Sequence, residues 1–276
     1  MTPPLNRAQS FALVLGGGAA RGGAHIGTLR ALTEADLHPS LVVGVSIGAV
    51  VGALYCLDPS QALSQLLSLA RTLQEMCTSL PLPLRIHKVL SLFSLKERCR
   101  IFTALGLHKV TFGQLQVPFL VTATRLWPPG RSILGRNPNV PVLEAVLAST
   151  ALPSRLPLRV RNSLYLDGGL SGNLPVRVAQ AAGAKTILAV NLGFLFAKGK
   201  GIQRYLPWKV INTLGQAQMC KERRQCERSG AQVVEIYSEA IEEESVLAFE
   251  KVDKFVEEGY KATLRIIPRL VKILTR

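Results

Sequence analysis

The first 57 residues contain the same succession twice, and this feature constrains the fold more than any other. Each half has a short apolar run, a turn that contains glycine, and a stretch with helical spacing. The apolar runs are residues 11–15 (FALVL) and 41–45 (LVVGV), and the helical stretches are residues 24–35 and 47–57. Strands without polar positions are typical of parallel sheets that helices cover on both faces. We therefore predict an α/β fold with a parallel sheet.

The rest of the chain continues this alternation. Further strands are predicted at residues 117–124, 163–166, 185–193 and 231–238, and residues 132–134 are compatible with a short one. Helices are predicted within residues 60–110, with breaks at Pro81 and Pro83, and at residues 141–150, 174–183, 208–229 and 245–275, the last interrupted at Pro268. No stretch is rich enough in linker residues to separate domains. We therefore predict a single-domain, three-layer α/β/α fold with a mostly parallel central sheet.

The formal net charge is +15 in a chain of 276 residues, and it is unevenly distributed. Residues 1–197 contribute +11, residues 198–230 contribute +6, and residues 231–276 contribute −2. A charge of this size predicts an anionic partner, either a lipid surface or a nucleic acid. Only 6% of the residues are aromatic, and no nucleic-acid-binding motif is present, so we expect no nucleic acid partner.

The cysteines and histidines form no metal-binding pattern. The five cysteines include no CxxC pair, and no histidine follows position 108. Scattered cysteines in odd number are typical of reduced thiols that fill the core. We therefore expect no metal site.

Residues 39–57 carry no charge and raise the question of a membrane span. The apolar part, residues 41–57, has only the minimum length for spanning, and glycines and a serine divide it into a strand-like and a helix-like part. We predict a strand, a sharp turn and a buried helix there. The N-terminus is polar, and the apolar run after it is too short for a signal peptide. We therefore expect a cytoplasmic protein, and leave peripheral contact with a membrane open.

Ser46 is the first candidate for chemistry, because residues 44–48 (GVSIG) fit the G-x-S-x-G pattern of a nucleophile elbow. A nucleophilic serine at a strained turn between strand and helix needs small neighbours, here Gly44 and Gly48. The alternative is a serine that merely packs in a tight turn. A nucleophilic serine also needs a base. The order Ser46, Asp58, then His87 or His108 would compress a histidine triad into about sixty residues, so we expect no such triad.

Asp167 is the second candidate. It follows the apolar strand at residues 163–166 and precedes Gly168 and Gly169. A carboxylate at the end of a strand lies where α/β sheets place their active sites. The alternative is an aspartate that only caps a loop.

A glycine-rich turn at residues 15–23 (LGGGAARGG) is the third candidate. It follows a strand and opens a helix, so its backbone N–H groups could converge on an anion or an oxyanion. A P-loop would need a lysine, which is absent. A dinucleotide fingerprint fails in both registers, because Arg21 or Ala19 occupies a position that requires glycine.

Together, these segments resemble the patatin-like phospholipase family. The resemblance rests on VLGGGAARGGAHIGTLRAL, GVSIGAVVGAL and DGGLSGNLPVRVAQAAGAKTILAVNL, with weaker similarity in VPFLVTAT, ASTALPSRLP and VDKFVEEGYKA. It implies a patatin-like acyl hydrolase domain at residues 11–268, an N-terminal tail at residues 1–10 and a basic C-terminal tail at residues 269–276. It also implies the patatin-like form of the α/β/α fold.

The resemblance assigns roles to the three candidates. It implies a serine–aspartate dyad, with Ser46 as nucleophile and Asp167 as base, and no cofactor. The glycine-rich loop would supply the oxyanion hole through the N–H groups of Gly17, Gly18 and Ala19. The glycines and the arginine that support these motifs are Gly16, Arg21, Gly22, Gly44, Gly48, Gly168 and Gly169.

Two positions depart from the family pattern, and one histidine belongs to it. Ala19 stands where a third glycine is commoner, and its N–H can still serve if its φ is negative. Arg125 stands where similar chains often carry an aspartate, which predicts a more positive surface near the end of the sheet. We interpret His25, in the loop–helix motif, as structural.

The expected function is a lipid acyl hydrolase of the phospholipase A or lysophospholipase type. Its substrate would be a lipid or another acyl ester, and peripheral contact with an anionic membrane would fit the basic residues within 85–109 and 125–161 and the alternating segment 264–276. The alternatives are a non-catalytic lipid-binding relative and a nucleotide-binding α/β protein. The oligomeric state stays open.

Overall fold

A single mixed sheet forms the centre of the molecule. The computed structural model describes residues 10–79, 81, 92, 94–152, 156–193 and 206–275, with only the backbone for residues 206–212. Within these residues, eight strands form one sheet in the order β5-β6-β3-β2-β1-β7-β8, and β4 pairs with β3 outside this path. Most neighbours in this order are consecutive strands in the sequence, and the exceptions are β1 beside β7 and β3 beside β6.

The middle of the sheet is parallel. Its strands are β1 (Ala12–Leu15), β2 (Leu41–Val45), β3 (Phe119–Arg125), β7 (Thr186–Val190) and β8 (Gln232–Ile236). The shorter strands β4 (Gly130–Leu134), β5 (Leu158–Val160) and β6 (Ser163–Leu166) pair antiparallel beyond β3. Because the five central strands are parallel, the segments that leave their carboxyl ends meet at one edge of the sheet.

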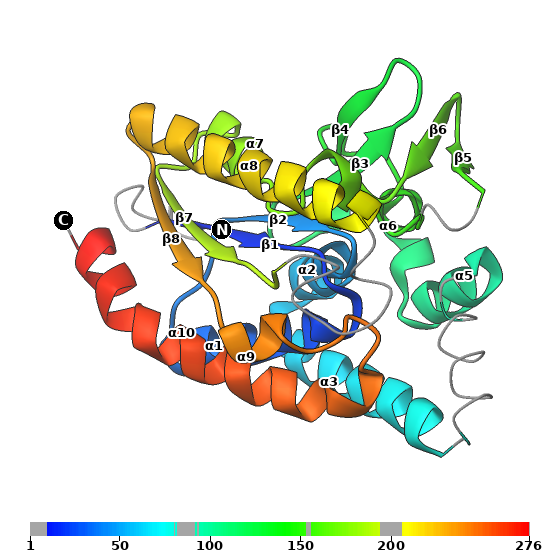
Figure 1. Cartoon of the computed structure of the whole chain (residues 1–276), viewed down its shortest axis with the longest axis horizontal. Helices are drawn as coiled ribbons and strands as arrows, with labels where there is room; N and C mark the ends of the chain where they lie inside the picture. The colour runs from blue at the N-terminus through cyan, green and yellow to red at the C-terminus, as the bar shows by residue number, and fades with distance from the viewer. Residues whose placement is uncertain are drawn as a thin grey trace.

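Helices cover both faces of the sheet, which makes the three layers (Figure 1). One layer contains α1 (Gly23–Glu34), α2 (Ile47–Leu57), α3 (Pro59–Thr78) and α10 (Val252–Leu274). The opposite layer contains α7 (Val176–Ala181) and α8 (Leu206–Arg228). The remaining helices are α5 (Leu95–Ala104), α6 (Val142–Ser149) and α9 (Glu239–Glu242), with short 3-10 turns η2 (Ala19–Gly22), η3 (Leu107–Lys109), η4 (Phe112–Gln114), η5 (Gly168–Ser171) and η7 (Phe249–Lys251).

The alternation of side chains along β1 divides the core in two. Leu13 and Leu15 pack with the layer that contains α1, α2 and α10. Ala12 and Val14 pack with the layer that contains α7 and α8. Both faces of a wholly apolar strand are therefore used, which explains why β1 and β2 have no polar position.

Helices α1 and α10 approach each other closely through glycine. A Cβ on Gly27 would lie 1.9 Å from the carbonyl oxygen of Val256, and a Cβ on Gly259 would lie 2.2 Å from the carbonyl oxygen of Ala24. Buried between the two helices, the hydroxyl of Thr263 donates to that of Thr28 at 3.0 Å. This contact holds the last helix against the helix that follows the glycine-rich loop.

The predicted order of strands and helices and the three-layer α/β fold are confirmed. Residues 41–57 form β2, the turn at Ser46 and α2, as predicted. No helix in the described part of the chain is both long enough and apolar enough to cross a membrane. α3 ends at Thr78, before the first predicted break at Pro81, and Pro83 lies outside the described residues.

The sequence-based prediction missed the short helix α9 and was wrong or incomplete in two further details. The predicted interruption at Pro268 does not occur, because α10 continues through it to Leu274. Proline removes one helical hydrogen bond, but Leu270 and Leu274 beyond it are buried in the core, and their packing keeps the helix intact. The short strand β5 was not predicted, since three residues are too few for a recognisable alternation.

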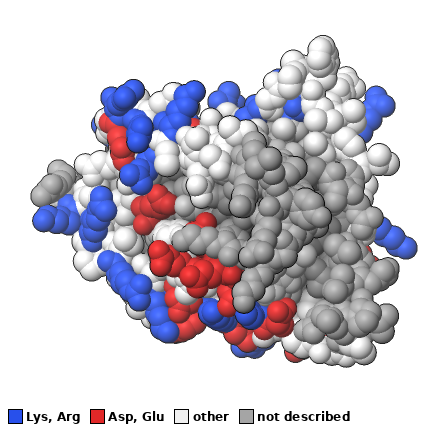
Figure 2. Space-filling model, viewed as in Figure 1, with Lys and Arg blue, Asp and Glu red and all other residues white. Residues whose placement is uncertain are grey.

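Charge is unevenly distributed over the molecular surface. Figure 2 shows Asp and Glu side chains gathered over α9 and the neighbouring part of α10, while Lys and Arg lie around the rim of the same face. These elements are rich in glutamate, with Glu239 and Glu242 in α9, Glu243 and Glu244 directly after it, and Glu257 and Glu258 in α10. The net positive charge therefore belongs to other parts of the surface.

Candidate active site

Ser46 occupies the turn between β2 and α2 in a strained backbone conformation. Its φ of 53° and ψ of −123° place a non-glycine residue in a region that costs roughly 1–3 kcal/mol. The turn is crowded, because a Cβ on Gly48 would lie 2.1 Å from the carbonyl oxygen of Leu15, and one on Gly44 would lie 2.5 Å from that of Gly48. Only glycine fits at these two flanking positions, which is the requirement that the G-x-S-x-G pattern predicts.

The structure brings Ser46 and Asp167 into direct contact. The Oγ of Ser46 donates a hydrogen bond to the Oδ2 of Asp167 at 2.7 Å. The other carboxylate oxygen accepts the backbone N–H of Gly169 at 2.8 Å. These two residues are 121 positions apart in the sequence. The fold joins them because β2 ends beside Thr122 of β3, and the antiparallel strand β6 ends at Leu166 beside Thr124 of the same strand.

Asp167 is a buried carboxylate with altered acidity. Only 5% of the residue is exposed. Burial raises the pKa of this carboxyl from 3.8 to about 6, against the opposing effects of the hydrogen bonds from Ser46 and Gly169 and of the positive charge of Arg98. A carboxylate with a raised pKa is a better proton acceptor near neutral pH than an ordinary aspartate.

The end of α6 holds the backbone of both residues. The N–H of Ser46 donates to the Oγ of Ser149 at 2.8 Å, and Ser149 in turn donates to the carbonyl of Thr122 at 2.7 Å. The N–H of Asp167 donates to the carbonyl of Ala151 at 2.6 Å. One turn of chain at residues 149–151 therefore fixes the positions of Ser46 and Asp167 relative to each other.

Arg98 on α5 is attached to this same turn. It is 6% exposed, and its Nη1 donates to the carbonyl of Leu147 at 2.9 Å and to the Oγ1 of Thr150 at 2.8 Å. Its positive charge lowers the pKa of Asp167. Arg98 lies within the basic region 85–109 that we expected to suit a membrane surface, and for this buried residue the expectation was wrong. The sequence of a basic stretch does not show which of its arginines lies on the side of the helix that faces the core.

The glycine-rich loop presents two backbone N–H groups that are free to bind. The N–H of Gly16 donates to the carbonyl of Val190 at 3.1 Å, and that of Gly17 to the carbonyl of Asn173 at 3.3 Å. The N–H groups of Gly18 and Ala19 make no hydrogen bond with any other residue that the structure describes. Of the three expected donors, Gly17 is thus already engaged, while Gly18 and Ala19 are available.

Ala19 does not have the negative φ that we expected. Its φ is 46°, in the left-handed region, where an L-residue with a Cβ costs roughly 1–2 kcal/mol. The 3-10 turn η2 begins at this residue, and the N–H of Ala20 is fixed to the carbonyl of Val246 at 3.0 Å, so the neighbouring contacts impose the conformation. This strain explains why glycine is the commoner residue here. The N–H of Ala19 nevertheless stays available.

Asn173 fixes the loop from the other side. Its Nδ2 is buried and donates to the carbonyls of Gly17 at 3.0 Å and Gly193 at 3.2 Å. A Cβ on Gly17 would lie 2.4 Å from the Oδ1 of Asn173 and 3.2 Å from the Cβ of Ser46, so glycine allows all three to meet. Sequence reasoning included Asn173 in the matching segment DGGLSGNLP but gave it no role. The only feature of the sequence that could have indicated a role for Asn173 is its position as a single asparagine between small and apolar residues.

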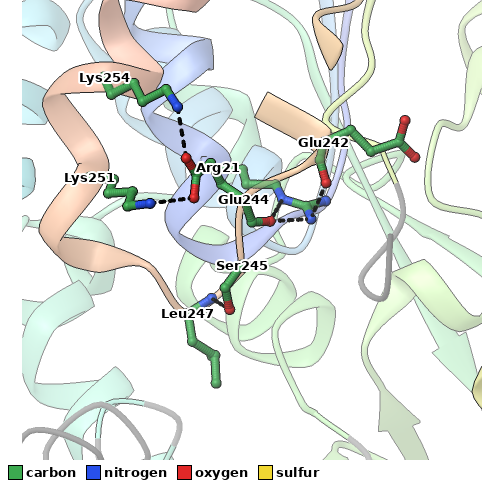
Figure 3. A network of polar contacts seen from close by, with 7 residues as sticks. All are labelled: Arg21, Glu242, Glu244, Ser245, Leu247, Lys251 and Lys254. Atoms are coloured by element: carbon green, nitrogen blue, oxygen red, sulfur yellow. Dashed lines mark hydrogen bonds and ion pairs between the residues drawn. The ribbon is translucent and has the colours of Figure 1, made fainter. Parts of the chain in front are cut away.

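Arg21 clamps the loop to the segment that precedes α10. It is 1% exposed, and it donates to the carbonyl of Leu192 at 3.0 Å. It also donates to the carbonyls of Glu242 at 2.9 Å and Glu244 at 2.6 Å (Figure 3). The carboxylate of Glu244 in turn binds Lys251 and Lys254 at 2.5 and 2.7 Å. Burial lowers the pKa of Arg21 to about 10, so it stays charged at neutral pH. Its contacts are those of a structural clamp.

The other residues of the motifs surround the Ser46–Asp167 pair. A Cβ on Gly22 would lie 2.4 Å from Ile47, and one on Gly168 would lie 2.2 Å from the carbonyl of Thr122. His25 is fully buried, and its Nε2 donates to the carbonyl of Gly16 at 2.8 Å. Burial lowers the pKa of His25 to about 4, so it is neutral at pH 7 and its contact is structural, as we interpreted it.

Arg125 lies at the end of β3, near the sheet edge that carries Ser46. The Nε of Arg125, at the end of β3, donates to the carbonyl of Pro128 at 3.1 Å. Within the described residues, no group of three or more His, Cys, Asp and Glu side chains is arranged to hold a metal ion.

Comparison with known proteins finds a family model whose match includes all three motifs. A family model described as patatin-like phospholipase matches residues 13–179. Over 194 residues the chain is 33% identical to mouse patatin-like phospholipase domain-containing protein 6, an alignment that covers 67% of this chain and 14% of the relative. It is 27% identical over 287 residues to lysophospholipase NTE1 of Mycosarcoma maydis, which covers 94% of this chain and 15% of that protein.

A solved structure is also similar. VipD from Legionella pneumophila matches with a TM-score of 0.48 and 16% identity, covering 95% of this chain and 67% of that chain. The chain spans about one seventh of the length of the curated relatives that it matches.

Proposed function

Since this chain belongs to the patatin-like phospholipase family, we propose that it is a lipid acyl hydrolase of the phospholipase A or lysophospholipase type. The observation that carries the proposal is the 2.7 Å hydrogen bond from the Oγ of Ser46 to the carboxylate of Asp167. Beside this pair, the loop offers the unoccupied N–H groups of Gly18 and Ala19 as oxyanion donors. A nucleophile, a base and an oxyanion site are the parts that ester hydrolysis requires.

The proposed reaction begins with attack of the Ser46 Oγ on the ester carbonyl carbon, while Asp167 accepts the serine proton. The carbonyl oxygen becomes an oxyanion, and the N–H groups of Gly18 and Ala19 stabilise it. Each such donor contributes on the order of 3 kcal/mol in enzymes of this kind.

When the tetrahedral intermediate collapses, the alcohol or lysolipid leaves with the proton from Asp167, and an acyl-enzyme remains. Asp167 then takes a proton from water, whose oxygen attacks the acyl carbonyl. Release of the fatty acid restores the Ser46 hydroxyl, so no group outside the chain is needed to balance the reaction.

A lysophospholipid is the first substrate to test, because the Mycosarcoma maydis relative, whose alignment covers 94% of this chain, is named a lysophospholipase. A phospholipid, a neutral glyceride and a simple ester are the comparison substrates. The expected result is release of fatty acid by the wild-type chain and a loss of at least a thousandfold in Ser46→Ala and Asp167→Asn.

The main alternative is a non-catalytic relative that binds lipid. It predicts that wild type and both variants bind lipid equally and that none releases fatty acid. Equal turnover by wild type and Ser46→Ala would also contradict the proposal. A nucleotide-binding protein, the other alternative, would retain a nucleotide on purification.

We also propose peripheral contact with an anionic membrane, through the edge of the sheet where Ser46 lies. β3 is parallel to β2, so the residues after Arg125 emerge at that edge. Trp127, two residues beyond the end of β3, is 82% exposed, and Leu170, just after the Asp167 turn, is 45% exposed. Exposed apolar side chains and a net charge of +15 together suit an anionic lipid surface.

The basic residues do not contribute equally to such a surface. Arg131, within the basic region 125–161, forms an ion pair with Glu222 at 2.6 Å, and its side chain is only 16% exposed. Arg136 and Arg159 are exposed. The last helix also differs from the free amphipathic segment that we considered at residues 264–276, because Leu270 and Leu274 are buried in the core.

A further inference from the structure

Arg98 on α5 is a buried cation whose hydrogen bonds go to neutral groups. Its Nη1 donates to the carbonyl of Leu147 and to the hydroxyl of Thr150, and none of the carboxylates that the structure describes forms an ion pair with it. Its Nε is also buried and has no hydrogen-bond partner in the described part of the chain. An arginine stays charged in a protein, and a buried charge without a partner lowers the free energy of unfolding. Stability alone therefore does not explain an arginine at this position.

The packing of α5 on α6 determines where this charge lies. Arg98 and Phe102 are one helical turn apart on the same face of α5, and each is 6% exposed. This face packs on α6. The other charged residues of α5 lie away from it, since Glu97 and Arg100 pair with each other and Lys96 is exposed. The guanidinium of Arg98 is thus fixed at the carboxyl end of α6.

The carboxyl end of α6 lies against both members of the Ser46–Asp167 pair. The hydroxyl of Ser149 accepts the N–H of Ser46, and the carbonyl of Ala151 accepts the N–H of Asp167. The last carbonyl groups of a helix carry partial negative charge, which opposes a carboxylate beside them. Arg98 places a positive charge at these carbonyls. Burial raises the pKa of Asp167 to about 6, and the charge of Arg98 is one of the effects that oppose this rise.

The other titratable side chains around Asp167 do not supply this charge. The turn after Asp167 packs on β3, β4 and α6, and β6 before it pairs with β5. Arg131 of β4 and Glu144 of α6 each form an ion pair with another residue. The remaining titratable groups on these elements and on α2 are Tyr55, Cys56, Arg125, Arg159 and Tyr165. The pKa of Asp167 responds to the charge of Arg98 and not to these groups.

We propose that Arg98 is a positioning residue for the base: from the end of α6 it holds the carboxylate of Asp167 against the Ser46 hydroxyl and supplies the positive charge that stabilises this carboxylate. The inference rests on the proposed function, because a base needs a fixed position and a negative charge. Arg98 acts through residues 147–151 rather than by contact with the reacting atoms. α5, which carries no other residue of the site, thereby becomes part of the catalytic arrangement.

The first experiment follows the titration of Asp167 by nuclear magnetic resonance of isotope-labelled aspartate carboxyl groups. The signal of Asp167 is identified by its loss in Asp167→Asn. We expect its midpoint to rise by about half a pH unit or more in the neutral variants Arg98→Gln and Arg98→Met, because a nearby positive charge favours the carboxylate. Arg98→Lys keeps the charge and should stay within about 0.2 pH unit of wild type. The signals to resolve are few, namely those of Asp36, Asp58, Asp167 and Asp253.

The matched control is Arg71→Gln, which removes the same charge from an exposed position on α3. It should leave the midpoint of Asp167 unchanged, because water and salt screen an exposed charge.

The second experiment measures kcat and kcat/KM for a water-soluble ester as a function of pH. The acid limb of kcat/KM should move to higher pH by the same amount as the midpoint of Asp167. At about pH 8.5 the carboxylate is ionised in every variant, so only the loss of position remains. We expect kcat there to fall about tenfold in Arg98→Gln and Arg98→Met and less in Arg98→Lys, with little change in KM, because small displacements of a base are costly.

The midpoint of Asp167 separates this inference from the proposed function, because it needs no catalysis. A wild-type midpoint in folded Arg98→Gln or Arg98→Met would show that Arg98 serves only the fold and would overturn the inference, as would the failure of both variants to fold. A wild-type kcat at about pH 8.5 would overturn the part that concerns position. A raised midpoint in a chain that hydrolyses no ester would support the effect of Arg98 on Asp167 and remove the proposed function. Hydrolysis with an unchanged midpoint would remove only the role of Arg98.

Discussion

Asp167 combines burial with a hydrogen bond to the candidate nucleophile, so its ionisation should control the pH dependence of the reaction. Only the carboxylate form can accept the Ser46 proton. Because burial raises the pKa of this group to about 6, we expect kcat/KM for a water-soluble ester to fall about tenfold per pH unit below pH 6 and to level off above it. Circular dichroism at each pH serves as the control for folding. An acid limb centred near pH 4, the ordinary range of an aspartate, would contradict this assignment.

The burial of the Asp167 carboxylate should also lower the free energy of unfolding at neutral pH. The unfolded chain has the ordinary pKa of 3.8, whereas the native value is about 6, so the native state binds more protons between these values. Stability then falls as pH rises from about 4 to 6, by on the order of 3 kcal/mol in total. Asp167→Asn, which cannot ionise, should therefore have a higher Tm than wild type at pH 8 and nearly the same Tm at pH 4. A variant that is less stable than wild type at pH 8 would refute the argument.

Residues whose role depends on a local pattern could be predicted from the sequence, and residues whose role depends on distant contacts could not. Gly44 and Gly48 identify the turn at Ser46 in the sequence, because a Cβ at either position would overlap backbone atoms. Ser149 and Asn173 act through hydrogen bonds to residues 103 and 156 positions away, which leave no local trace. The engaged N–H of Gly17 and the positive φ of Ala19 likewise follow from neighbours that the loop sequence does not show.

At the scale of elements, the end of α6 is the part that sets the geometry of the site. Ser149→Ala removes the partner of the Ser46 N–H and leaves that strained turn without its side-chain anchor. An unpaired buried donor costs about 1–3 kcal/mol. We expect a lower free energy of unfolding by that amount, and a fall in kcat at 25 °C where the variant is still folded. Ser68→Ala, at an exposed position on α3, is the control. Wild-type values of both quantities would show that α6 does not hold the turn.

The central strands and helices were predictable because their apolar sequences match the buried positions that they occupy. β2 and α2 begin and end where their composition changes, since a wholly apolar strand and a wholly apolar helix are both buried. Local rules failed where packing outweighed them. Pro268 lies inside α10 because Leu270 and Leu274 anchor the helix end. β5 exists only through its pairing with β6.

At the scale of the whole molecule, the sheet edge that carries Ser46 also carries the exposed Trp127. We expect Trp127→Ala to weaken binding to vesicles that contain phosphatidylglycerol by about tenfold, because an aromatic side chain that leaves water contributes roughly 1.5–3 kcal/mol at full burial. Sedimentation with vesicles measures this. Leu214→Ala, which removes a 64% exposed side chain from α8, should bind like wild type. Binding should also fall steeply with salt, and binding that neither salt nor Trp127→Ala reduces would contradict the proposed orientation.

The net charge of the molecule could be read from the sequence, but the surface that carries it could not. Arg98 and Arg131 belong to basic stretches of the sequence. However, Arg98 on α5 is buried against the end of α6, and Arg131 forms an ion pair with Glu222. The three-layer arrangement, by contrast, follows from the alternation of apolar strands and helices, because parallel strands need helices on both faces.

The proposed mechanism depends most directly on the reactivity of the Ser46 hydroxyl group. The measurement is the reaction of the folded chain with a fluorophosphonate, followed by intact mass and peptide mapping. We predict one equivalent of label on Ser46, no label in Ser46→Ala, and much slower labelling in Asp167→Asn. Labelling of a different residue, or no labelling of the folded wild-type chain under conditions that label a serine esterase, would contradict the claim that Ser46 is activated by Asp167.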